Sequence, residues 1–209
     1  MIDKKKIFSN FGSLNNVALE LGCGNRKRSK NAIGIDAIDY DCVDIVGDIF
    51  EVLSRFPSKS ISRIEAYHFF SHVENQLLLL QEVNRLLKSD GILKIVAPHF
   101  SNPFFYSDPT HRKFFGLYTM AYYASNKIFS RTVPNYQYNL NLTLTSVKLI
   151  FKSVPPRYIR HAIKKLFQSF VNSSNWCKEF YEENLCYFIP CYEIEYLISS
   201  TKPTNEIIN

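Results

Sequence analysis

Short apolar runs separated by polar turns recur through the first half of the chain. Runs of this length, each ending near an acidic residue or a histidine, are typical of buried strands in a parallel sheet. They predict five strands, at residues 17–21, 33–36, 43–47, 61–67 and 92–97. Apolar residues at helical spacing predict a helix over 73–88, ended by Ser89-Asp90-Gly91, and a shorter helix over 49–55. The alternation indicates an open, mostly parallel α/β sheet with its ligand across the carboxyl ends of the strands.

The pattern changes after Pro98. Residues 99–139 are rich in aromatic side chains and poor in aliphatic runs, so we expect loops and one or two helices over the ligand-binding face. Alternating apolar and polar positions predict further strands, and helical spacing predicts two further helices. The strands are expected at 140–152 and 187–199, and the helices at about 157–171 and 175–184.

The helix expected over 157–171 is both apolar and basic. Its apolar positions fall on one stripe, and Lys and Arg occupy the rest of its surface. The stripe comprises Ile159, Ile163, Leu166, Phe167 and Phe170, and the cations are Arg157, Arg160, Lys164 and Lys165. We expect the stripe to pack on the core of the protein. Contact with a membrane surface is the alternative, because basic amphipathic helices also lie at bilayer interfaces.

Composition and charge narrow the class of protein. Hydrophobic residues make up 46% of the 209 residues and charged residues 21%, as in a globular protein. The net charge of +6 is uneven, because residues 101–170 contain one acid, Asp108, and ten cations. These are Arg112, Lys113, Lys127, Arg131, Lys148, Lys152, Arg157, Arg160, Lys164 and Lys165. Such a field favours an anionic partner: an acidic sugar, a phosphorylated carrier, nucleic acid or a membrane surface.

The chain shows no sign of secretion or membrane insertion. No apolar run is long enough to span a bilayer, and no signal-peptide core follows the lysines at 4–6. The odd count of five cysteines and their irregular spacing favour reduced thiols over disulfides or a zinc motif. We therefore expect a cytoplasmic protein, with the inner face of the membrane as an alternative location.

Three successive predicted strands end in carboxylates, which suits a nucleoside ligand. Asp36 can accept both ribose hydroxyls, Asp48 can accept from an adenine amino group or cap the following helix, and Glu20 can orient the glycine turn. The loop at 25–32 is too short for a crossover helix and lacks the third glycine of a dinucleotide site. The ligand expected from these residues is an adenosine compound without a pyrophosphate.

Five segments then match a known family in order and spacing. They are Glu20-Leu21-Gly22-Cys23-Gly24, Gly34-Ile35-Asp36, Gly47-Asp48, His68-Phe69-Phe70-Ser71-His72 and the run from Leu86 to Leu93. Together they resemble the class I S-adenosylmethionine-dependent methyltransferases. The resemblance implies a Rossmann-like, seven-stranded, mostly parallel sheet with an antiparallel last strand. It also implies one domain over 1–209, with a cofactor-binding half at 1–98, substrate-side loops, strand and helices at 99–186, and a closing strand at 187–199.

The same resemblance assigns roles around S-adenosylmethionine, the implied cofactor. Glycines and carboxylates at the strand ends would surround it, and a histidine after the fourth strand would lie near the sulfonium. The implied cofactor-binding residues are Glu20, Gly22, Cys23, Gly24, Asp36, Ala37, Asp48, Ile49 and His68. This sequence departs from the family by lacking the helix after the first strand. The carboxylate end of the cofactor is then left to the basic loop, at Lys27 or Arg28.

A second motif follows the fifth strand. Asp108-Pro109-Thr110-His111 and its neighbours are similar to a segment of methyltransferases encoded with bacterial surface-polysaccharide genes. This resemblance implies O-methylation of a sugar hydroxyl in a surface glycan or its precursor. Removal of the hydroxyl proton needs a base, and histidine suits that task near neutral pH. The candidates are His111 or His99 as base, Asp108 as its orienting carboxylate, and Arg112 and Tyr106 for the substrate.

Other interpretations remain open at this level. The Asp-Pro-Thr-His segment also suits a purely structural turn. The basic half suits a nucleic-acid methyltransferase, although no amino-methylation signature or RNA-binding module accompanies it. A non-catalytic S-adenosylmethionine-binding subunit is a third alternative. His68 and His72 stand four residues apart, but with no third ligand at a convincing spacing we expect no metal site.

Overall fold

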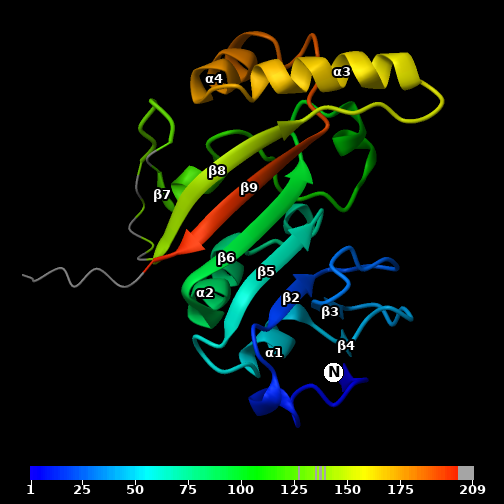
Figure 1. The fold of residues 1–209 in the computed structure, drawn as a ribbon, viewed down its shortest axis with the longest axis vertical. Helices are drawn as coiled ribbons and strands as arrows, with labels where there is room; N and C mark the ends of the chain where they lie inside the picture. Colours follow the sequence, from blue (N-terminus) through cyan, green and yellow to red (C-terminus); the bar gives the residue numbers. More distant parts are fainter. Residues whose placement is uncertain (127, 135, 137, 139, 202–209) are drawn as a thin grey trace, which may run out of the picture.

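The protein is built on one twisted sheet (Figure 1). The computed structural model describes residues 1–126, 128–134, 136, 138 and 140–201. Within this part of the chain nine strands lie in the order β1-β4-β3-β2-β5-β6-β9-β8-β7. They are β1 (Ile2–Asp3), β2 (Ala18–Leu21), β3 (Ile33–Asp36), β4 (Ile45–Val46), β5 (Ile61–Tyr67), β6 (Leu87–Pro98), β7 (Ser125–Asn126), β8 (Leu142–Ile150) and β9 (Glu193–Ser200).

The sheet is mostly parallel and contains the expected antiparallel closing strand. The pairs β4-β3, β3-β2, β2-β5 and β5-β6 are parallel, and β9 runs antiparallel to both β6 and β8. The prediction of seven strands is wrong in number, because β1 and β7 extend the two edges. Each has only two residues, too few to show a periodic pattern.

The helices near the predicted positions differ mainly at their ends. They are α1 (Ile49–Ser54), α2 (Gln76–Leu86), α3 (Tyr158–Val171) and α4 (Asn175–Asn184). Asn75 caps α2, and the preceding residues form the short 3-10 helix η2 (Phe70–His72), so the helix is shorter than 73–88. Ser89-Asp90-Gly91 does not end α2. It lies within β6, which begins directly after Leu86.

The aromatic segment after β6 contains short 3-10 helices instead of α-helices within its described residues. These are η3 (Pro103–Ser107) and η4 (Thr119–Tyr122). Lys127 lies outside the described residues. Phe115, Leu117 and Met120 of this segment are fully buried, so it contributes to the core as well as covering the strand ends.

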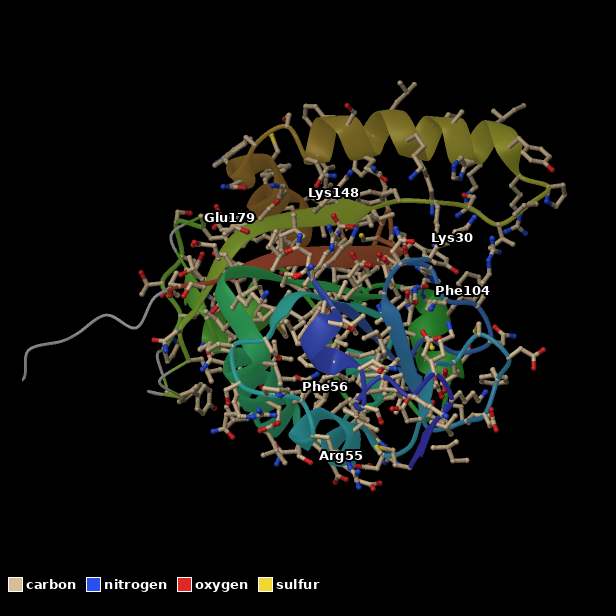
Figure 2. All side chains as sticks on the ribbon, turned by 60° about the horizontal axis from the view of Figure 1, so that its bottom comes forward. Lys30, Arg55, Phe56, Phe104, Lys148 and Glu179 are labelled. Carbon is tan, nitrogen blue, oxygen red and sulfur yellow. The ribbon has the colours of Figure 1, made fainter. Side chains whose placement is uncertain are left out.

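Helix α3 lies along the β8 edge of the sheet, at the opposite end of the molecule from the N-terminus (Figure 1). The expected packing of its apolar stripe on the core is wrong for four of five residues. Ile159, Ile163, Leu166 and Phe170 are between 61% and 81% exposed. Only the Phe167 ring packs inward, 5.2 Å from the Phe151 ring. Figure 2 shows side chains of α3 on both sides of the helix, some toward the sheet and others away from it.

Polar side chains fix the inner side of α3, which explains this orientation. Gln168 Oε1 accepts a hydrogen bond of 2.9 Å from the backbone N–H of Phe151, and His161 Nδ1 accepts one of 3.2 Å from Ser153. Asn172, at the end of the helix, exchanges hydrogen bonds with the backbone of Leu149 in β8. These contacts satisfy edge groups of the sheet and leave the apolar stripe toward solvent.

Among the described residues, no helix combines the length and apolar character needed to cross a membrane.

Candidate active site

The turn after β2 brings the chain close to the aromatic ring of Phe69. Gly22 and Gly24 have φ values of +62° and +59°, which glycine adopts without strain. A Cβ placed on Gly22 would lie 2.3 Å from a ring carbon of Phe69. Both the backbone conformation and this close approach therefore require glycine at position 22.

A cavity of about 530 Å³ opens at the carboxyl ends of β2, β3 and β4. Its volume lies in the range of small-molecule sites. Five of the nine cofactor residues implied by the sequence line it, together with four residues that follow β5. The five are Gly22, Asp36, Ala37, Asp48 and Ile49, and the four are Phe69, His72, Val73 and Glu74.

Two of the carboxylates that line this cavity, Asp36 and Asp48, are held by backbone donors. Asp36 Oδ2 accepts from the N–H of Gly24 at 2.8 Å, and Asp36 Oδ1 accepts from the N–H of Ile38 at 3.0 Å. Asp48 Oδ1 accepts from Phe50 and Glu51, so it caps α1, one of the two roles expected for it. Each Asp36 oxygen keeps a second lone pair, so the carboxylate can accept further hydrogen bonds from a ribose.

Glu20 holds the basic loop at 25–32 in place next to the glycine turn. Both Glu20 oxygens accept backbone N–H bonds, from Arg28 at 2.9 Å and from Ser29 at 2.7 Å, and the side chain is buried. The Lys27 ammonium donates to Asp44 at 2.7 Å and to the carbonyl of Ala32 at 2.8 Å, so it is engaged within the protein. No helix forms in this loop.

Cys23 does not line the cavity, and its thiol is packed into the protein. The side chain is buried with Val43 and Val46. Burial, followed by the charge of Asp36, raises the pKa of the Cys23 thiol to about 12. The thiol therefore stays neutral near pH 7 and acts as a small apolar group.

His68 belongs to a polar group that the sequence did not reveal. Its Nε2 lies 2.9 Å from Oε1 of Glu193 in β9, and Lys152 Nζ donates to the same oxygen at 2.6 Å. Burial alone would raise the pKa of Glu193, but the hydrogen bonds from His68 and Lys152 lower it to about 2. Two glutamates in an otherwise apolar strand, Glu193 and Glu195, were the available signal.

His99 lies in the interior of the protein. The residue is fully buried, and its ring nitrogens lie 2.8 Å from Ser101 Oγ and 3.1 Å from Glu182 Oε2. Glu182 also accepts from the N–H of Leu117. Because both ring nitrogens have protein partners, His99 has no free nitrogen with which to take a proton from an acceptor.

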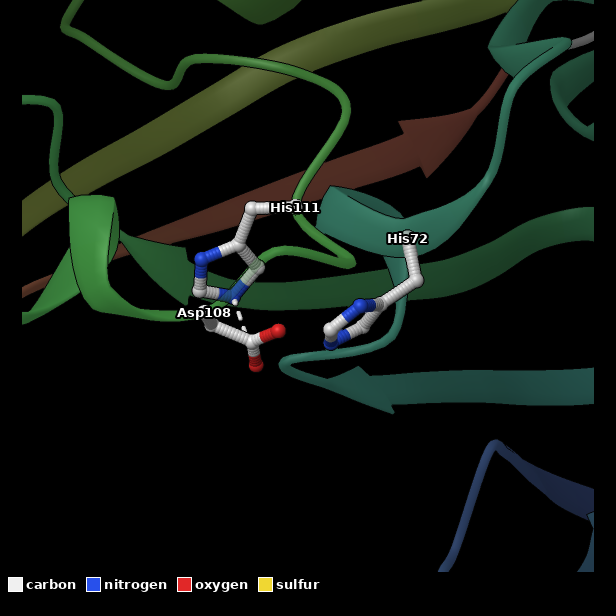
Figure 3. Close-up of side chains that lie close together, drawn as sticks. All are labelled: His72, Asp108 and His111. Atoms are coloured by element: carbon white, nitrogen blue, oxygen red, sulfur yellow. Dashed lines mark ion pairs between the residues drawn. The ribbon is translucent and has the colours of Figure 1, made fainter.

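The second histidine candidate lies in a side-chain cluster beside the cavity (Figure 3). His111 Nε2 is 3.8 Å from Asp108 Oδ2, and the His111 and His72 rings are 4.8 Å apart between centroids. Hydrogen bonds from the Thr110 side chain and backbone lower the pKa of Asp108, so this carboxylate remains charged. The expected turn and the expected histidine–carboxylate pair are therefore both present.

The two candidate substrate residues are exposed near this cluster. Arg112 donates its backbone N–H to the carbonyl of Ser71 at 2.7 Å, which ties the loop to η2, and its side chain is exposed. Tyr106 is 65% exposed and donates its hydroxyl to the carbonyl of Phe100 at 3.0 Å. Both side chains are accessible to an acceptor from solvent.

A separate basic cavity of about 260 Å³ lies under the N-terminal end of α3. Phe104, labelled in Figure 2, forms part of its wall with Asn102 and Tyr192. Four cations line it: Lys152, Arg157, Arg160 and Lys164. Burial and the neighbouring Arg160 lower the pKa of Lys164. Such a concentration of positive charge favours an anionic group in the cavity.

Comparison with known proteins agrees with the geometry. Residues 8–95 match the family model described as a methyltransferase domain, and no curated protein matches the chain. The chain is similar in structure to a SAM-dependent methyltransferase from Archaeoglobus fulgidus, with 15% identity, a TM-score of 0.59, and coverage of 94% of this chain and 92% of that one. It is also similar to the YcgJ protein of Bacillus subtilis, with 15% identity, a TM-score of 0.54, and coverage of 90% and 92%.

The two structural neighbours bear on the fold, and the family model bears on the activity. The matched region, 8–95, contains β2 to β5 and most of β6, and with them every residue of the 530 Å³ cavity. The match of residues 8–95 to a methyltransferase domain, together with this fold and this cavity, supports methyltransferase activity with S-adenosylmethionine as the cofactor.

Proposed function

We propose that the protein O-methylates a sugar hydroxyl of a surface glycan or its lipid- or nucleotide-linked precursor, with His111 as base. The observation that carries the proposal is the contact between two sites. His72 lines the cofactor cavity and lies 4.8 Å, ring to ring, from His111. The cavity proposed for the cofactor therefore adjoins a histidine–carboxylate pair.

The hydrogen bonds of His111 suit it to proton removal. Its Nδ1 lies 2.8 Å from the carbonyl oxygen of Phe105, and a carbonyl only accepts, so Nδ1 carries the proton. Nε2 then has the free lone pair that a base requires, and Asp108 nearby stabilises the ring once it is protonated. S-adenosylmethionine supplies the activated methyl group, so the chain has only to align the acceptor and take its proton.

The basic cavity supports an anionic acceptor. Phosphates of a lipid- or nucleotide-linked sugar would meet Lys152, Arg157, Arg160 and Lys164 there, and arginine can hold a phosphate by paired hydrogen bonds. Lys152 also connects this cavity to the cofactor half, because it shares Glu193 with His68.

The proposal also places α3 on an anionic membrane surface. The exposed stripe of Ile159, Ile163, Leu166 and Phe170 is of the kind that enters the headgroup region of a bilayer. The sequence contains no Asp or Glu between Asp108 and Glu179, so the surrounding charge complements anionic lipid. A lipid-linked acceptor would then be presented at the same face as the basic cavity.

The proposed role of Asp36 in holding the ribose of S-adenosylmethionine is tested by measuring cofactor binding. Asp36→Ala is expected to weaken S-adenosylmethionine binding about 100-fold, because charge-assisted hydrogen bonds to the ribose would be lost. Asp39→Ala is the matched control, since Asp39 lies outside the cavity and pairs with Lys4 on the surface. Isothermal titration of both variants gives the answer. Equal affinity in Asp36→Ala and the parent would remove Asp36 from the ribose site.

The acceptor is tested by mass spectrometry of candidate glycans and their precursors, with a gain of one methyl as the expected result. His111→Ala should lose turnover, on the order of 100-fold or more, and keep cofactor affinity. Unchanged turnover would eliminate His111 as base. A nucleic-acid substrate is the alternative outcome, and it would show a steep fall of binding with salt.

Membrane contact is tested with vesicles. Leu166→Ser should reduce co-sedimentation with vesicles rich in anionic lipid, whereas Leu78→Ser should not. Leu78 is an exposed leucine on α2, so the two changes are chemically matched. Equal sedimentation with neutral and anionic vesicles would contradict the proposed surface.

A further inference from the structure

Three potential metal ligands converge next to the cofactor cavity. One coordinating atom from each of His72, Asp108 and His111 lies within 4.8 Å of the others. Figure 3 shows the carboxylate of Asp108 between the two imidazole rings. The ligands come from η2 and from the loop after η3, two segments joined by the backbone hydrogen bond from Arg112 to Ser71.

The hydrogen bonds around the cluster leave the same nitrogen free on both rings. His111 Nδ1 donates to the carbonyl of Phe105, as described above. His72 Nδ1 lies 2.9 Å from Thr110 Oγ1 and 3.3 Å from the Thr110 carbonyl, so it too carries its proton. Both Nε2 atoms therefore have free lone pairs, which is the form of histidine that binds a metal.

Each ligand also has a partner that fixes its orientation. Thr110 donates to Asp108 Oδ1 from its hydroxyl at 2.6 Å and from its backbone N–H at 2.9 Å, which leaves Oδ2 toward His111. Metal-binding histidines regularly donate their second ring N–H to a carbonyl or another polar group, as His72 and His111 do here. Thr110 thus connects Asp108 to His72 and orients both.

We propose that His72, Asp108 and His111 form a binding site for a divalent first-row transition metal, with open coordination positions toward the cofactor cavity. Two imidazoles and one carboxylate are a donor set of catalytic zinc and non-haem iron sites. Three protein ligands leave positions for water or an acceptor oxygen. Metal–nitrogen distances near 2 Å would draw the three donor atoms to roughly 3 to 3.5 Å from one another.

The site gives a second explanation of how an acceptor hydroxyl is activated, and this part rests on the proposed methyl transfer. A hydroxyl bound to the metal loses its proton more readily, and the proton passes to bulk water. The acceptor oxygen then forms its bond to the methyl carbon as the carbon–sulfur bond of the cofactor breaks. His111 Nε2 would serve as a ligand and could not serve as the base at the same time.

Metal binding is measured on the full chain without acceptor. Protein stripped with a chelator is titrated with Co²⁺, followed by visible absorption, and with Zn²⁺, followed by calorimetry. We expect one metal per chain and a loss of affinity of at least about 10-fold in His72→Ala, Asp108→Ala and His111→Ala. Thr110→Val should weaken binding about 10-fold by removing the hydroxyl that orients two ligands.

His161→Ala is the control, because His161 is a half-buried histidine on α3 and outside the cluster. It should bind metal as the parent does, and thermal melts establish that each variant is folded. Absence of a saturable signal in the parent, or unchanged affinity in folded Asp108→Ala and His111→Ala, would overturn the site.

The catalytic part has its own outcome. Stripped enzyme that regains methyl transfer on addition of metal supports activation by the metal. Full activity of stripped enzyme overturns that activation and returns His111 to the role of base. Failure to find any methylated acceptor would instead count against the proposed function, since the titrations need no acceptor.

Discussion

Helices α2 and α3 both have clear apolar stripes, but the surroundings of the two stripes are opposite. In α2 the stripe of Leu79, Leu80, Val83 and Leu86 is fully buried. In α3 the stripe of Ile159, Ile163, Leu166 and Phe170 faces solvent. The periodicity that predicts both helices states which side chains share a face, and it does not state what covers that face.

The difference in burial of the two stripes follows from the position of each helix relative to the sheet. Helix α2 is followed immediately by β6 and packs on the sheet, so strands cover its apolar face. Helix α3 lies at an edge, where β8 presents backbone groups that need hydrogen-bond partners. Gln168 and Asn172 meet that need from the inner side of α3, and the apolar stripe is left outside.

The largest expected effect is in α2. Leu80→Ala should lower the free energy of unfolding by about 3 kcal/mol, because it leaves a cavity in a fully buried cluster. Denaturant unfolding of the variant and the parent measures this value. A loss below about 1 kcal/mol would contradict the difference between the two helices, since a change of that size is expected at an exposed position and not in a buried cluster.

An intermediate effect on stability is expected at Glu193 in β9, the strand between β6 and β8. Its folded pKa of about 2 lies below the ordinary 4.5, so its contribution is present above pH 4.5 and disappears as pH falls toward 2. Glu193→Gln should cost roughly 2 kcal/mol at pH 7 and remove this part of the pH dependence.

The matched control for that change is Glu195→Gln. Glu195 lies two residues further along β9 and pairs with Lys94 at 2.9 Å, with a fifth of each side chain exposed. Its replacement should cost less than about 1 kcal/mol. Unfolding measured between pH 2 and pH 7 would refute the assignment if Glu193→Gln kept the acid sensitivity of the parent.

The smallest effect is expected on the outer side of α3. Leu166→Ala should change the free energy of unfolding by no more than about 0.5 kcal/mol, because the side chain is mostly exposed. The same measurement as for Leu80→Ala serves here. A loss comparable to that of α2 would mean that the stripe is covered in solution, for example by a second copy of the chain, and would argue against its being free for a membrane.

Much of the candidate cofactor site could be predicted from the sequence because its determinants are local. A strand end, a glycine turn and a following carboxylate are encoded within a few residues, as at Gly22 and Asp36, and the parallel sheet brings successive strand ends together. The extra edge strands were missed because two residues carry no pattern.

The acceptor side was less accessible, since its residues are distant in sequence. Nothing in the local pattern distinguishes His99, buried against Glu182, from His111, placed beside Asp108 and His72. In the sequence, the spacing of four residues suggested His68 as the partner of His72. In the structure His68 binds Glu193, and His72 meets side chains from the loop after η3.

The sequence alone determined most of the strands, the helices and the carboxylates at the strand ends, because periodicity and turn chemistry act over a few residues. The tertiary structure decided which faces are covered, which histidine is free and which side chains form the cluster at Asp108. These depend on contacts between segments far apart in the chain, and no local pattern specifies which segments will meet.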